Sequence, residues 1–565
     1  MKVRRWRLGV AGLLLLGACT SPSPDLVIRD VNVIDLPAGR LAGAQTVVID
    51  EGRIVKIGSG RVARGTVEID GSGKYLIPGL IDAHVHVDHA DELNLYPAYG
   101  VTGAMVLRGL PQHLTWRSEI ADGARFGPRL FTAGDYMDGY PPYMQPMMSF
   151  EDVESARQSV RQQQTAGYDF VKVYSRLSDE QHAAIVEETH SGGRCVVGHG
   201  NPNIPLPDLI AHGQDNIAHG QDLIRWYFDS ANDPNGIDRV VDALRGSGVT
   251  VTANLSWTDG LLAQGSDLEG LLARPVARAL HPAILQPFRP ENNRYIRNAE
   301  EWVPEVRERL AVERALTLAL HQAGVTLLAG TDASTSGVFP GDALHIELEQ
   351  LVSAGMTPAE ALATATTHAA DFLARCVSSE LRLGRVAIDH SADLVLLDAN
   401  PLEEIGNTRR IAGVVLAGRW YPAESLDAKL DSLDRHYAGL RPQVIQLEQA
   451  LFSGNTVEAR RLFDSARTEY PGEILFSQYT PFFVGYGFLF GEEGFNEDPV
   501  RLRAALDLYT LYAETYPQFH SAHYQLALAQ QANGQLNKAR ASLTHALKLH
   551  PWYPDAKRRL ADMEQ

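Results

Sequence analysis

The stretch that decides the fold is residues 76–86, which read LIPGLIDAHVH. An apolar run with the character of a β-strand ends there in His84 and His86. Side chains two positions apart point to the same face of a strand, so these two imidazoles are placed to bind one metal ion. The pattern alone is weak evidence, because His-X-His also occurs by chance and in structural roles.

Beyond this stretch, short apolar strands alternate with helical patterns from Ile77 to about Arg375. A helix is expected from Ser178 to Thr189, because Ser178 and Gln181 form a capping box at its start. Repeated β–α units over a segment of this length predict an α/β fold, a (β/α)8 TIM barrel that spans residues 77–375.

The segments on both sides of the predicted barrel are rich in short β-like runs. Residues 26–76 contain several such runs separated by Asp, Gly and Pro, which indicate tight turns. Residues 376–422 contain a second group, including ADLVLLD at 392–398. Neither segment is long enough to bury a core alone, so we expect the two to pair into one small β-sandwich.

The last segment, residues 424–565, has helical periodicity and a repeated spacing. Three alanines are each followed twelve positions later by a proline, and the last two prolines are 34 residues apart, which is the tetratricopeptide (TPR) period. The pairs are Ala459–Pro471, Ala505–Pro517 and Ala539–Pro551. We expect an all-α TPR-like domain that carries no chemistry and that leans on the barrel, on a second copy or on an envelope partner; a plain helical bundle is the alternative.

Residues 1–19 have the pattern of an export signal. Positive side chains precede an apolar run, Leu8 to Leu16, that is too short to span a bilayer. The run ends in residues 16–19, LGAC, which resembles the bacterial lipobox, where the cysteine (here Cys19) becomes lipidated. We expect a periplasm-facing lipoprotein of the bacterial cell envelope, on the outer membrane; a cleaved signal peptide with a chance cysteine is the alternative, and the export route stays open.

Charge and cysteine usage narrow the function classes. A net charge of −18 over 565 residues, without a basic stripe, argues against nucleic acid as a partner. The two remaining cysteines, Cys195 and Cys376, lie 181 positions apart. They do not form a disulfide framework, and we expect two buried free thiols.

Further motifs stand in order along the chain, and together with residues 76–86 they resemble the amidohydrolase superfamily. The nearest likeness is to the branch that contains imidazolonepropionase and the Xaa-Pro dipeptidases (prolidases). The resemblance covers about residues 26–422. The additional motifs are VKVY at 171–174, VGH at 197–199, NIAHG at 216–220 and GTDA at 330–333.

The resemblance implies a binuclear metal centre, with zinc as the expected metal. The more buried ion would be held by His84, His86 and Asp332, and the other by His199 and His219. Lys172 would be carboxylated and bridge the two ions, since an ammonium group cannot bind a cation. Asp332 would serve as catalytic base and then acid while a metal-bridged hydroxide attacks the amide carbonyl.

The substrate is less well defined by the sequence. Tyr174 shares a strand face with Lys172 and is a candidate substrate-binding residue, with packing as the alternative. Arg108 is a second candidate, for a substrate carboxylate. Many relatives carry Gly-Gly-His after the third strand, where this chain reads AGDY at 133–136, and this departure weakens the dipeptidase assignment. His89 is expected to be structural, and His281 receives no functional role.

The expected function is hydrolysis of an amide bond in a small substrate, a dipeptide or an N-acyl amino acid. A hydrolase of cyclic amides or lactones from the same superfamily is one alternative. The other alternative is an envelope scaffold that acts through the TPR-like repeats. The presence of Lys172 argues against imidazolonepropionase itself, whose class uses one ion and no bridging lysine.

Overall fold

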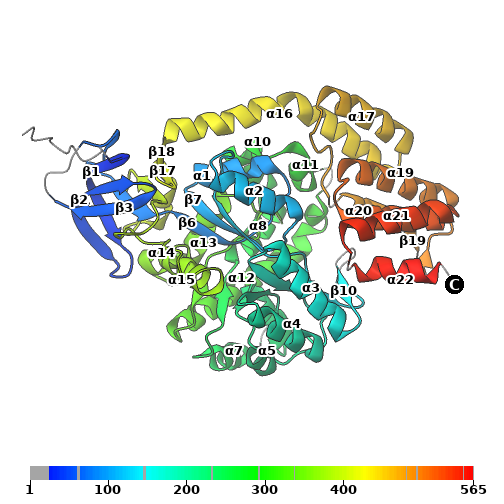
Figure 1. Cartoon of the computed structure of the whole chain (residues 1–565), viewed down its shortest axis with the longest axis horizontal. Coiled ribbons are helices and arrows are strands. Elements are labelled where there is room, and N and C mark those ends of the chain that lie inside the picture. Colours follow the sequence, from blue (N-terminus) through cyan, green and yellow to red (C-terminus); the bar gives the residue numbers. More distant parts are fainter. Residues whose placement is uncertain are drawn as a thin grey trace, which may run out of the picture.

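The computed structural model describes residues 24–59, 64–143, 148–230, 233–290, 293–335, 337–478, 480–491, 494–551 and 553–563. The expected export signal and the lipidation site at Cys19 lie outside these residues. In the described part, no helix combines the length and the apolar character needed to cross a membrane. Figure 1 shows a sheet at one end of the molecule, a central α/β part, and a helical tail at the other end.

The sheet at one end has eight strands and is built from both flanking segments. Its order is β18-β17-β16-β5-β1-β2-β3, with β4 also paired to β1. The segments meet where Leu394 lies opposite Pro78. The sheet has its own buried core, which includes Ile28 and Leu396. Its strands are β1 (Leu26–Asp35), β2 (Arg40–Asp50), β3 (Arg53–Gly58), β4 (Val67–Asp70), β5 (Tyr75–Pro78), β16 (Leu394–Leu397), β17 (Ile411–Leu416) and β18 (Arg419–Pro422).

The central part contains two parallel sheets, with orders β6-β7-β8 and β11-β12-β13-β14-β15. Parallel bridges connect them at both edges, one between Ala133 and Phe170 and one between Val85 and Ala333. The carboxyl ends of all these strands therefore face one side of the molecule. The strands are β6 (Leu80–Val85), β7 (Val101–Val106), β8 (Arg129–Thr132), β11 (Phe170–Val173), β12 (Cys195–Gly198), β13 (Asn216–Ile217), β14 (Thr250–Thr252) and β15 (Leu327–Leu328).

Helices follow these strands along the chain and pack around them. The longer ones are α2 (Pro111–Ala121), α3 (Val153–Ala166), α4 (Asp179–Ser191), α5 (Leu206–His212), α6 (Gly220–Tyr227), α7 (Gly236–Leu244), α8 (Leu255–Ser266), α12 (Ala299–Gln322), α13 (Asp342–Ser353), α14 (Pro358–Thr364) and α15 (Thr367–Cys376). Shorter elements are η1 (Ala90–Asn94), α1 (Leu95–Ala98), β9 (Asp138–Gly139), β10 (Ser149–Phe150), α9 (Leu268–Ala273), α10 (Pro275–Ala279), α11 (Pro282–Leu285), η2 (Gln286–Phe288), η3 (Arg294–Ile296) and η4 (Ile405–Arg409).

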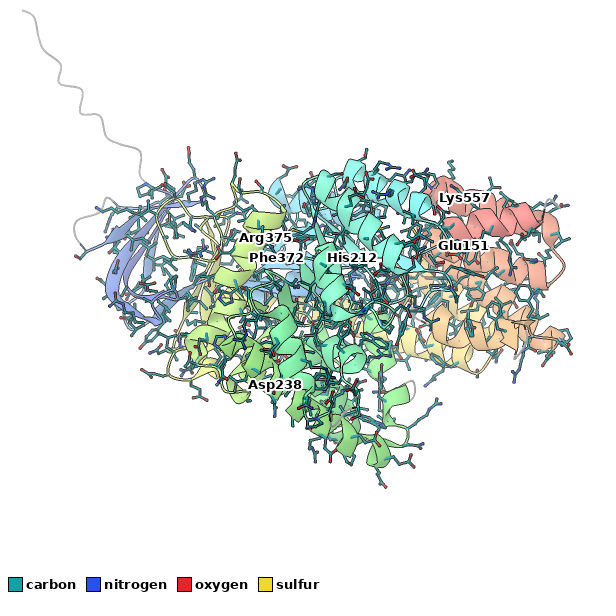
Figure 2. The ribbon with its side chains drawn as sticks, turned by 90° about the horizontal axis from the view of Figure 1, so that it is seen from below. Glu151, His212, Asp238, Phe372, Arg375 and Lys557 are labelled. Carbon is teal, nitrogen blue, oxygen red and sulfur yellow. A yellow bond between two sulfur atoms is a disulfide. The ribbon has the colours of Figure 1, made fainter. Side chains whose placement is uncertain are left out.

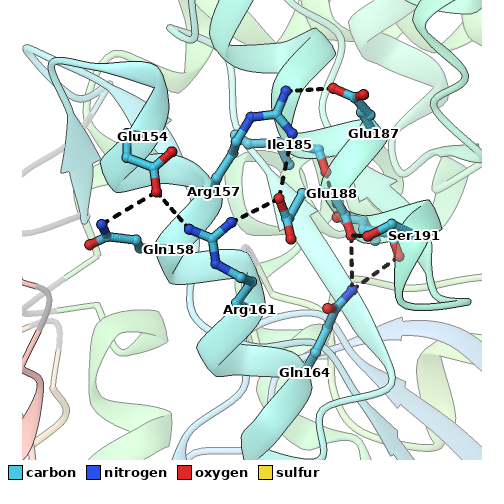
Figure 3. A network of polar contacts seen from close by, with 10 residues as sticks. Glu154, Arg157, Gln158, Arg161, Gln164, Ile185, Glu187, Glu188 and Ser191 are labelled. Carbon is cyan, nitrogen blue, oxygen red and sulfur yellow. Dashed lines mark hydrogen bonds and ion pairs between the residues drawn. The ribbon is translucent and has the colours of Figure 1, made fainter.

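Local sequence signals set the ends of these helices. The predicted capping box is present, because the amide of Gln181 donates to Ser178 Oγ (3.2 Å) and the amide of Ser178 donates to Gln181 Oε1 (2.9 Å). On the surface, α4 is tied to α3 by a network in which Arg161 pairs with Glu188 at 3.0 Å (Figure 3). Exposed pairs of this kind contribute only about 0–1 kcal/mol each, so apolar packing dominates this contact.

The expectation of two free thiols is wrong, because Cys195 and Cys376 form a disulfide. Cys195 begins β12 and Cys376 ends α15, and the two lie together in a buried cluster with Phe372. Their Cα atoms are 5.2 Å apart, inside the range that a disulfide requires. The sequence separation of 181 residues carries no information about this proximity, which arises from the packing of α15 against the strands.

The tail is helical and keeps the spacing seen in the sequence. The three repeated alanines, Ala459, Ala505 and Ala539, are fully buried between helices. Gly454 and Gly534, at equivalent places in the first and last units, both adopt φ near +70° (72° and 71°), which favours glycine. The elements are α16 (Ala423–Phe452), α17 (Thr456–Glu469), η5 (Pro481–Gly485), α18 (Tyr486–Leu489), β19 (Phe490–Gly491), β20 (Gly494–Phe495), α19 (Pro499–Thr515), α20 (His520–Ala532), α21 (Leu536–Leu549) and α22 (Pro554–Asp562).

The tail packs against the central part over a wide front. Helix α16 runs from the composite sheet along the central part to the remaining tail helices (Figure 1). One continuous apolar cluster contains Phe150 and Val173 of the central part together with Tyr437 and Phe476 of the tail. At the far end of the tail, Arg558 pairs with Glu151 at 3.1 Å, and Figure 2 shows Glu151 beside the end of the tail.

Candidate metal centre

The six expected ligand residues meet at the carboxyl ends of the parallel strands. His84 lies near the end of β6 and His86 directly follows it, Lys172 lies on β11, and the other three side chains follow β12, β13 and β15: His199, His219 and Asp332. Strand ends of one polarity gather on one face, which is where side chains from distant parts of the chain can form one site. All six residues line a single cavity.

His84, His86 and Asp332 form the first group. Asp332 Oδ1 lies 3.3 Å from His84 Nε2 and 2.7 Å from His86 Nε2. The backbone amide of Asp332 donates to the His84 carbonyl oxygen at 2.8 Å, which fixes β15 beside β6. Asp332 also adopts φ of 61°, a strained value for a residue other than glycine and one found at functional sites.

His199, His219 and Lys172 form the second group, directly beside the first. The ring centroid of His219 lies 4.4 Å from that of His199 and 4.6 Å from that of His84. Lys172 Nζ and His219 Nδ1 are buried and make no hydrogen bond with any described residue. Buried amines and imidazoles normally have hydrogen-bond partners or lie beside a metal ion, so these atoms mark a candidate metal site.

Burial sets the protonation of these side chains. Desolvation holds the pKa of His84 and His199 well below the usual value and lowers the pKa of His219 to about 3. These imidazoles are therefore neutral, as metal ligands must be. Desolvation also lowers the pKa of Lys172 to about 8. Burial raises the pKa of Asp332, but the opposite effect of His86 and other nearby groups is larger. The net pKa lies below the usual value, so this carboxyl group is ionised.

Two residues that support the candidate ligands, Asp222 and Asp82, were not predicted from the sequence. The Nδ1 of His199 donates to Asp222 Oδ2 at 2.8 Å, which directs the Nε2 of His199 into the site. Asp82 accepts from the Thr331 hydroxyl at 2.7 Å and from the Thr331 amide at 3.0 Å, joining β6 to the segment after β15 that carries Asp332. Asp82 stands within the opening motif, whereas Asp222 has no sequence signal beyond its place three positions after His219.

Both candidate substrate-binding residues lie on the cavity wall. The ring of Tyr174 is 3.9 Å from that of His199. The guanidinium of Arg108 lies over Tyr136 (5.7 Å to the ring centroid) and over Phe519 of the tail (5.6 Å). Tyr136 belongs to the stretch where the chain departs from the Gly-Gly-His pattern, and its ring is 6.4 Å from that of His86.

The tail forms part of the cavity wall, so a domain that was expected to carry no chemistry borders the candidate site. The cavity has a volume of about 1640 Å³ and its lining includes Glu448, Gln478 and Tyr512. Gln478 donates a hydrogen bond to Asp88, which stands two positions after His86. Helical periodicity predicts the tail helices. It contains no information about the surface on which they dock, so that surface could not be predicted from the sequence.

A second histidine cluster joins the tail to the central part. His89, His281 and Glu473 have ligand atoms within 4.8 Å of one another. The Nδ1 atoms of His89 and His281 both accept hydrogen bonds from backbone amides, so in the neutral rings Nε2 carries the proton. The Nε2 of His281 donates to Glu473 at 3.1 Å. This arrangement fits a hydrogen-bonded clasp between domains, because a metal ligand needs a free Nε2 lone pair.

Comparisons with known proteins agree with the motifs. Residues 290–421 match the amidohydrolase family. An adenine deaminase of Mesorhizobium japonicum is 37% identical over 67 residues, or 11% of each chain. A dihydroorotase of Trichlorobacter lovleyi is 42% identical over 64 residues, or 11% of this chain and 15% of that protein. The chain thus matches only a small share of the length of these curated relatives.

Solved structures match over more of the chain. A Xaa-Pro dipeptidase with bound methionine in its active site aligns with a TM-score of 0.54 and 20% identity, over 70% of this chain and 99% of that one. The bottromycin amidohydrolase aligns with a TM-score of 0.59 and 23% identity, over 72% and 90%. The ochratoxinase of A. niger aligns with a TM-score of 0.54 and 19% identity, over 71% and 96%.

At these identities the structural likeness concerns the fold. The family match covers residues 290–421, and the shared fold extends over 70–72% of the chain.

Proposed function

We propose that this protein is a binuclear metal-dependent amidohydrolase that cleaves the amide bond of a small peptide-like substrate, a dipeptide or an N-acyl amino acid. The observation that carries the proposal is the convergence of four imidazoles, one carboxylate and one buried lysine on a single cavity. Proteins with a similar fold include a Xaa-Pro dipeptidase and the bottromycin amidohydrolase. We further propose that the two parallel sheets form one closed (β/α)8 barrel.

Each group of side chains has a defined part in this proposal. His84, His86 and Asp332 would hold one divalent ion, zinc by default for a histidine-rich site. His199 and His219 would hold the second. Two bound ions would polarise the substrate carbonyl and lower the pKa of water in the site.

Lys172 would act as the bridging ligand after carboxylation. Its lowered pKa, about 8, leaves a fraction of the amine neutral near pH 7. The neutral amine can add to carbon dioxide and lose a proton, which gives a carbamate with two oxygen ligands. The buried position of Lys172 Nζ, without a hydrogen-bond partner among the described residues, supports this role.

Asp332 would move the proton during hydrolysis. Its carboxylate is ionised and can accept a proton from the attacking water. The same proton would then pass to the leaving nitrogen as the C–N bond breaks, which gives an amine and a carboxylic acid that ionises at neutral pH. Tyr174 and Arg108 would contact the substrate from the cavity wall.

The cellular setting is also a proposal. A lipid anchor at Cys19 would hold the protein on the periplasmic side of the outer membrane. The disulfide between Cys195 and Cys376 supports an oxidising compartment, since structural disulfides persist there. The tail would be a TPR-like domain, and the burial of its repeated alanines supports that assignment.

Metal analysis combined with a substrate screen tests the central proposal. Purified protein should contain about two divalent ions per chain, and the zinc-loaded protein should hydrolyse members of a dipeptide and N-acyl amino acid library. Lys172→Ala should abolish turnover, and added short carboxylic acids should partly restore it. One ion per chain together with full activity of Lys172→Ala would overturn the binuclear assignment.

A further inference from the structure

The tail contributes a chemically distinct part of the cavity wall. The loop around Gln478 hydrogen-bonds Asp88, two positions from His86, so this wall stands next to the metal centre. Glu448 near the end of α16, Tyr512 of α19 and Gln525 of α20 also line the cavity. Side chains from three tail helices therefore face the space in which a substrate of the proposed hydrolase would lie.

Glu448 is a buried carboxyl group on this wall with an unused oxygen. The residue is 1% exposed to solvent. Oε1 accepts a hydrogen bond from the Thr480 hydroxyl at 2.8 Å, and the backbone amide of Ser477 also acts on the carboxyl group, whereas Oε2 makes no hydrogen bond with a described residue. Burial raises the pKa of Glu448 to about 8. Near pH 7 this carboxyl group is therefore largely protonated, and a bound cation would favour its ionised form by supplying the missing donor.

The surroundings of Glu448 do not supply a compensating cation from the tail. Arg501, the tail cation among the described lining residues, is largely exposed and pairs with Asp498 at 4.0 Å. Gln525 is 6% exposed and its Oε1 also lacks a partner among the described residues. The tail wall therefore presents two buried acceptors to the cavity. Tyr512 adds aromatic surface, which attracts cations as well as alkyl chains, whereas the ring of Phe519 already lies against the guanidinium of Arg108.

We infer that Glu448 and Gln525 form an amine-binding subsite, in which the tail takes a primary ammonium group of the substrate at a distance from the scissile amide. An ammonium group has three donors and no acceptor, which matches a wall whose buried acceptors, Glu448 Oε2 and Gln525 Oε1, lack donors among the described residues. The position of the scissile bond at the metal centre rests on the proposed function, but the subsite itself does not.

The size of the cavity favours an amine several bonds away from the scissile bond. A volume of about 1640 Å³ exceeds the roughly 300–1000 Å³ of common small-molecule sites. A dipeptide would fill only part of it. A substrate with an extended aminoalkyl group, such as a lysine side chain, would reach from the metal centre to the tail wall and occupy both regions.

Direct binding measurements test the subsite without requiring turnover. The full-length protein would be titrated calorimetrically with N-acetyl-lysine methylamide and with N-acetyl-norleucine methylamide, which has the same shape without the ammonium group. We expect the wild type to bind the lysine probe at least about ten-fold more tightly, the scale of one charge-assisted hydrogen bond. Glu448→Gln should remove this preference and leave the affinity for the norleucine probe within about two-fold.

The control is Asp555→Asn, which changes another buried tail carboxylate. Asp555 is 5% exposed and touches Ser149 of the central part at 3.2 Å, but it does not line the cavity. This variant should keep the preference for the lysine probe. Gln525→Leu should weaken the preference, and it replaces Glu448→Gln if circular dichroism shows that the latter is not folded.

Three outcomes would overturn the subsite: no binding of either probe, no preference in the wild type, or a preference that survives in folded Glu448→Gln. A protein that binds no metal and hydrolyses nothing but still prefers the lysine probe would overturn the proposed function and leave the subsite standing. The two proposals are therefore separable in one set of samples.

Discussion

Burial without a compensating charge gives the six clustered side chains their chemical character. Lys172 is 1% exposed, and a lysine in such a position is expensive to keep charged. The neighbouring imidazoles are kept neutral by the same desolvation. Neutral imidazoles beside one ionised carboxylate, Asp332, are the kind of donor set that binds divalent cations.

The first prediction concerns proton transfer by Asp332. Asp332→Asn keeps the shape of the side chain but removes the ionised oxygen, so turnover should fall at least about 10²-fold. Metal content should fall less than in His84→Ala, because the amide oxygen remains a possible ligand. Steady-state kinetics and metal analysis on both variants provide the measurement. Near-normal turnover in Asp332→Asn would refute the proton-transfer role.

The second prediction concerns the positioning residue Asp222. Asp222→Ala removes the acceptor that orients His199, so the affinity for the second metal ion should fall about 10–100-fold. Competition with a chelator measures this affinity. Asp215→Ala is the matched control, because Asp215 pairs with His190 at the same 2.8 Å but outside the cavity. Equal metal affinities of the two variants would show that Asp222 does not position the ligand.

How far the sequence predicts the site depends on how local the signal is. The residues that meet at the metal centre follow apolar strands in recognisable motifs, and strand polarity alone brings such ends together. Asp222 and Glu448 have no such signal. Glu448 stands in an amphipathic helix where a glutamate ordinarily faces solvent, but here it is buried and bonded by Thr480 from a later segment of the tail.

At the level of elements, contacts between distant segments hold the site in place. The capping box at Ser178 is a local signal and was predictable. The disulfide that joins β12 to α15 connects residues 181 positions apart. The clasp between His281 and Glu473 connects residues 192 positions apart. Contacts at such separations depend on tertiary packing, which composition and periodicity do not encode.

The third prediction concerns the clasp. The hydrogen bond from His281 lowers the pKa of Glu473 to about 2, below the usual value of 4.5. Because the folded pKa is depressed, the stabilisation is fully present above about pH 4.5 and is lost as the pH falls toward 2. Glu473→Gln should therefore lower the free energy of unfolding by about 1–3 kcal/mol at pH 7, with a smaller difference near pH 3.

Urea denaturation at several pH values measures this effect. Glu469→Gln is the control, since Glu469 is an exposed tail glutamate that bonds Gln443 within the tail. It should change stability by no more than about 0.5 kcal/mol. A difference between wild type and Glu473→Gln that stays constant from pH 7 to pH 3 would contradict the assignment of the clasp.

At the scale of the whole molecule, the tail and the central part share a core and a cavity. Phe150 and Tyr437 belong to one apolar cluster, and Arg108 lies over Phe519. Removal of the tail would therefore expose apolar surface and would also open one wall of the cavity. The sequence alone suggests a hydrolytic core and a separate binding tail. A shared core and a shared cavity do not fit that division of labour.

The last prediction is the behaviour of a chain that ends at Pro422. The helical tail covers Met137 and Phe150, both fully buried in the intact chain. Exposing side chains of this size costs roughly 1.5–3 kcal/mol each, so the shortened protein should melt at a lower temperature and associate in solution. Turnover should fall because the cavity loses the wall that contains Gln478 and Glu448. Melting curves, light scattering and kinetics on matched samples measure all three effects. A shortened protein that stays monomeric, melts at the full-length temperature and keeps full turnover would show that neither the shared core nor the tail wall is needed.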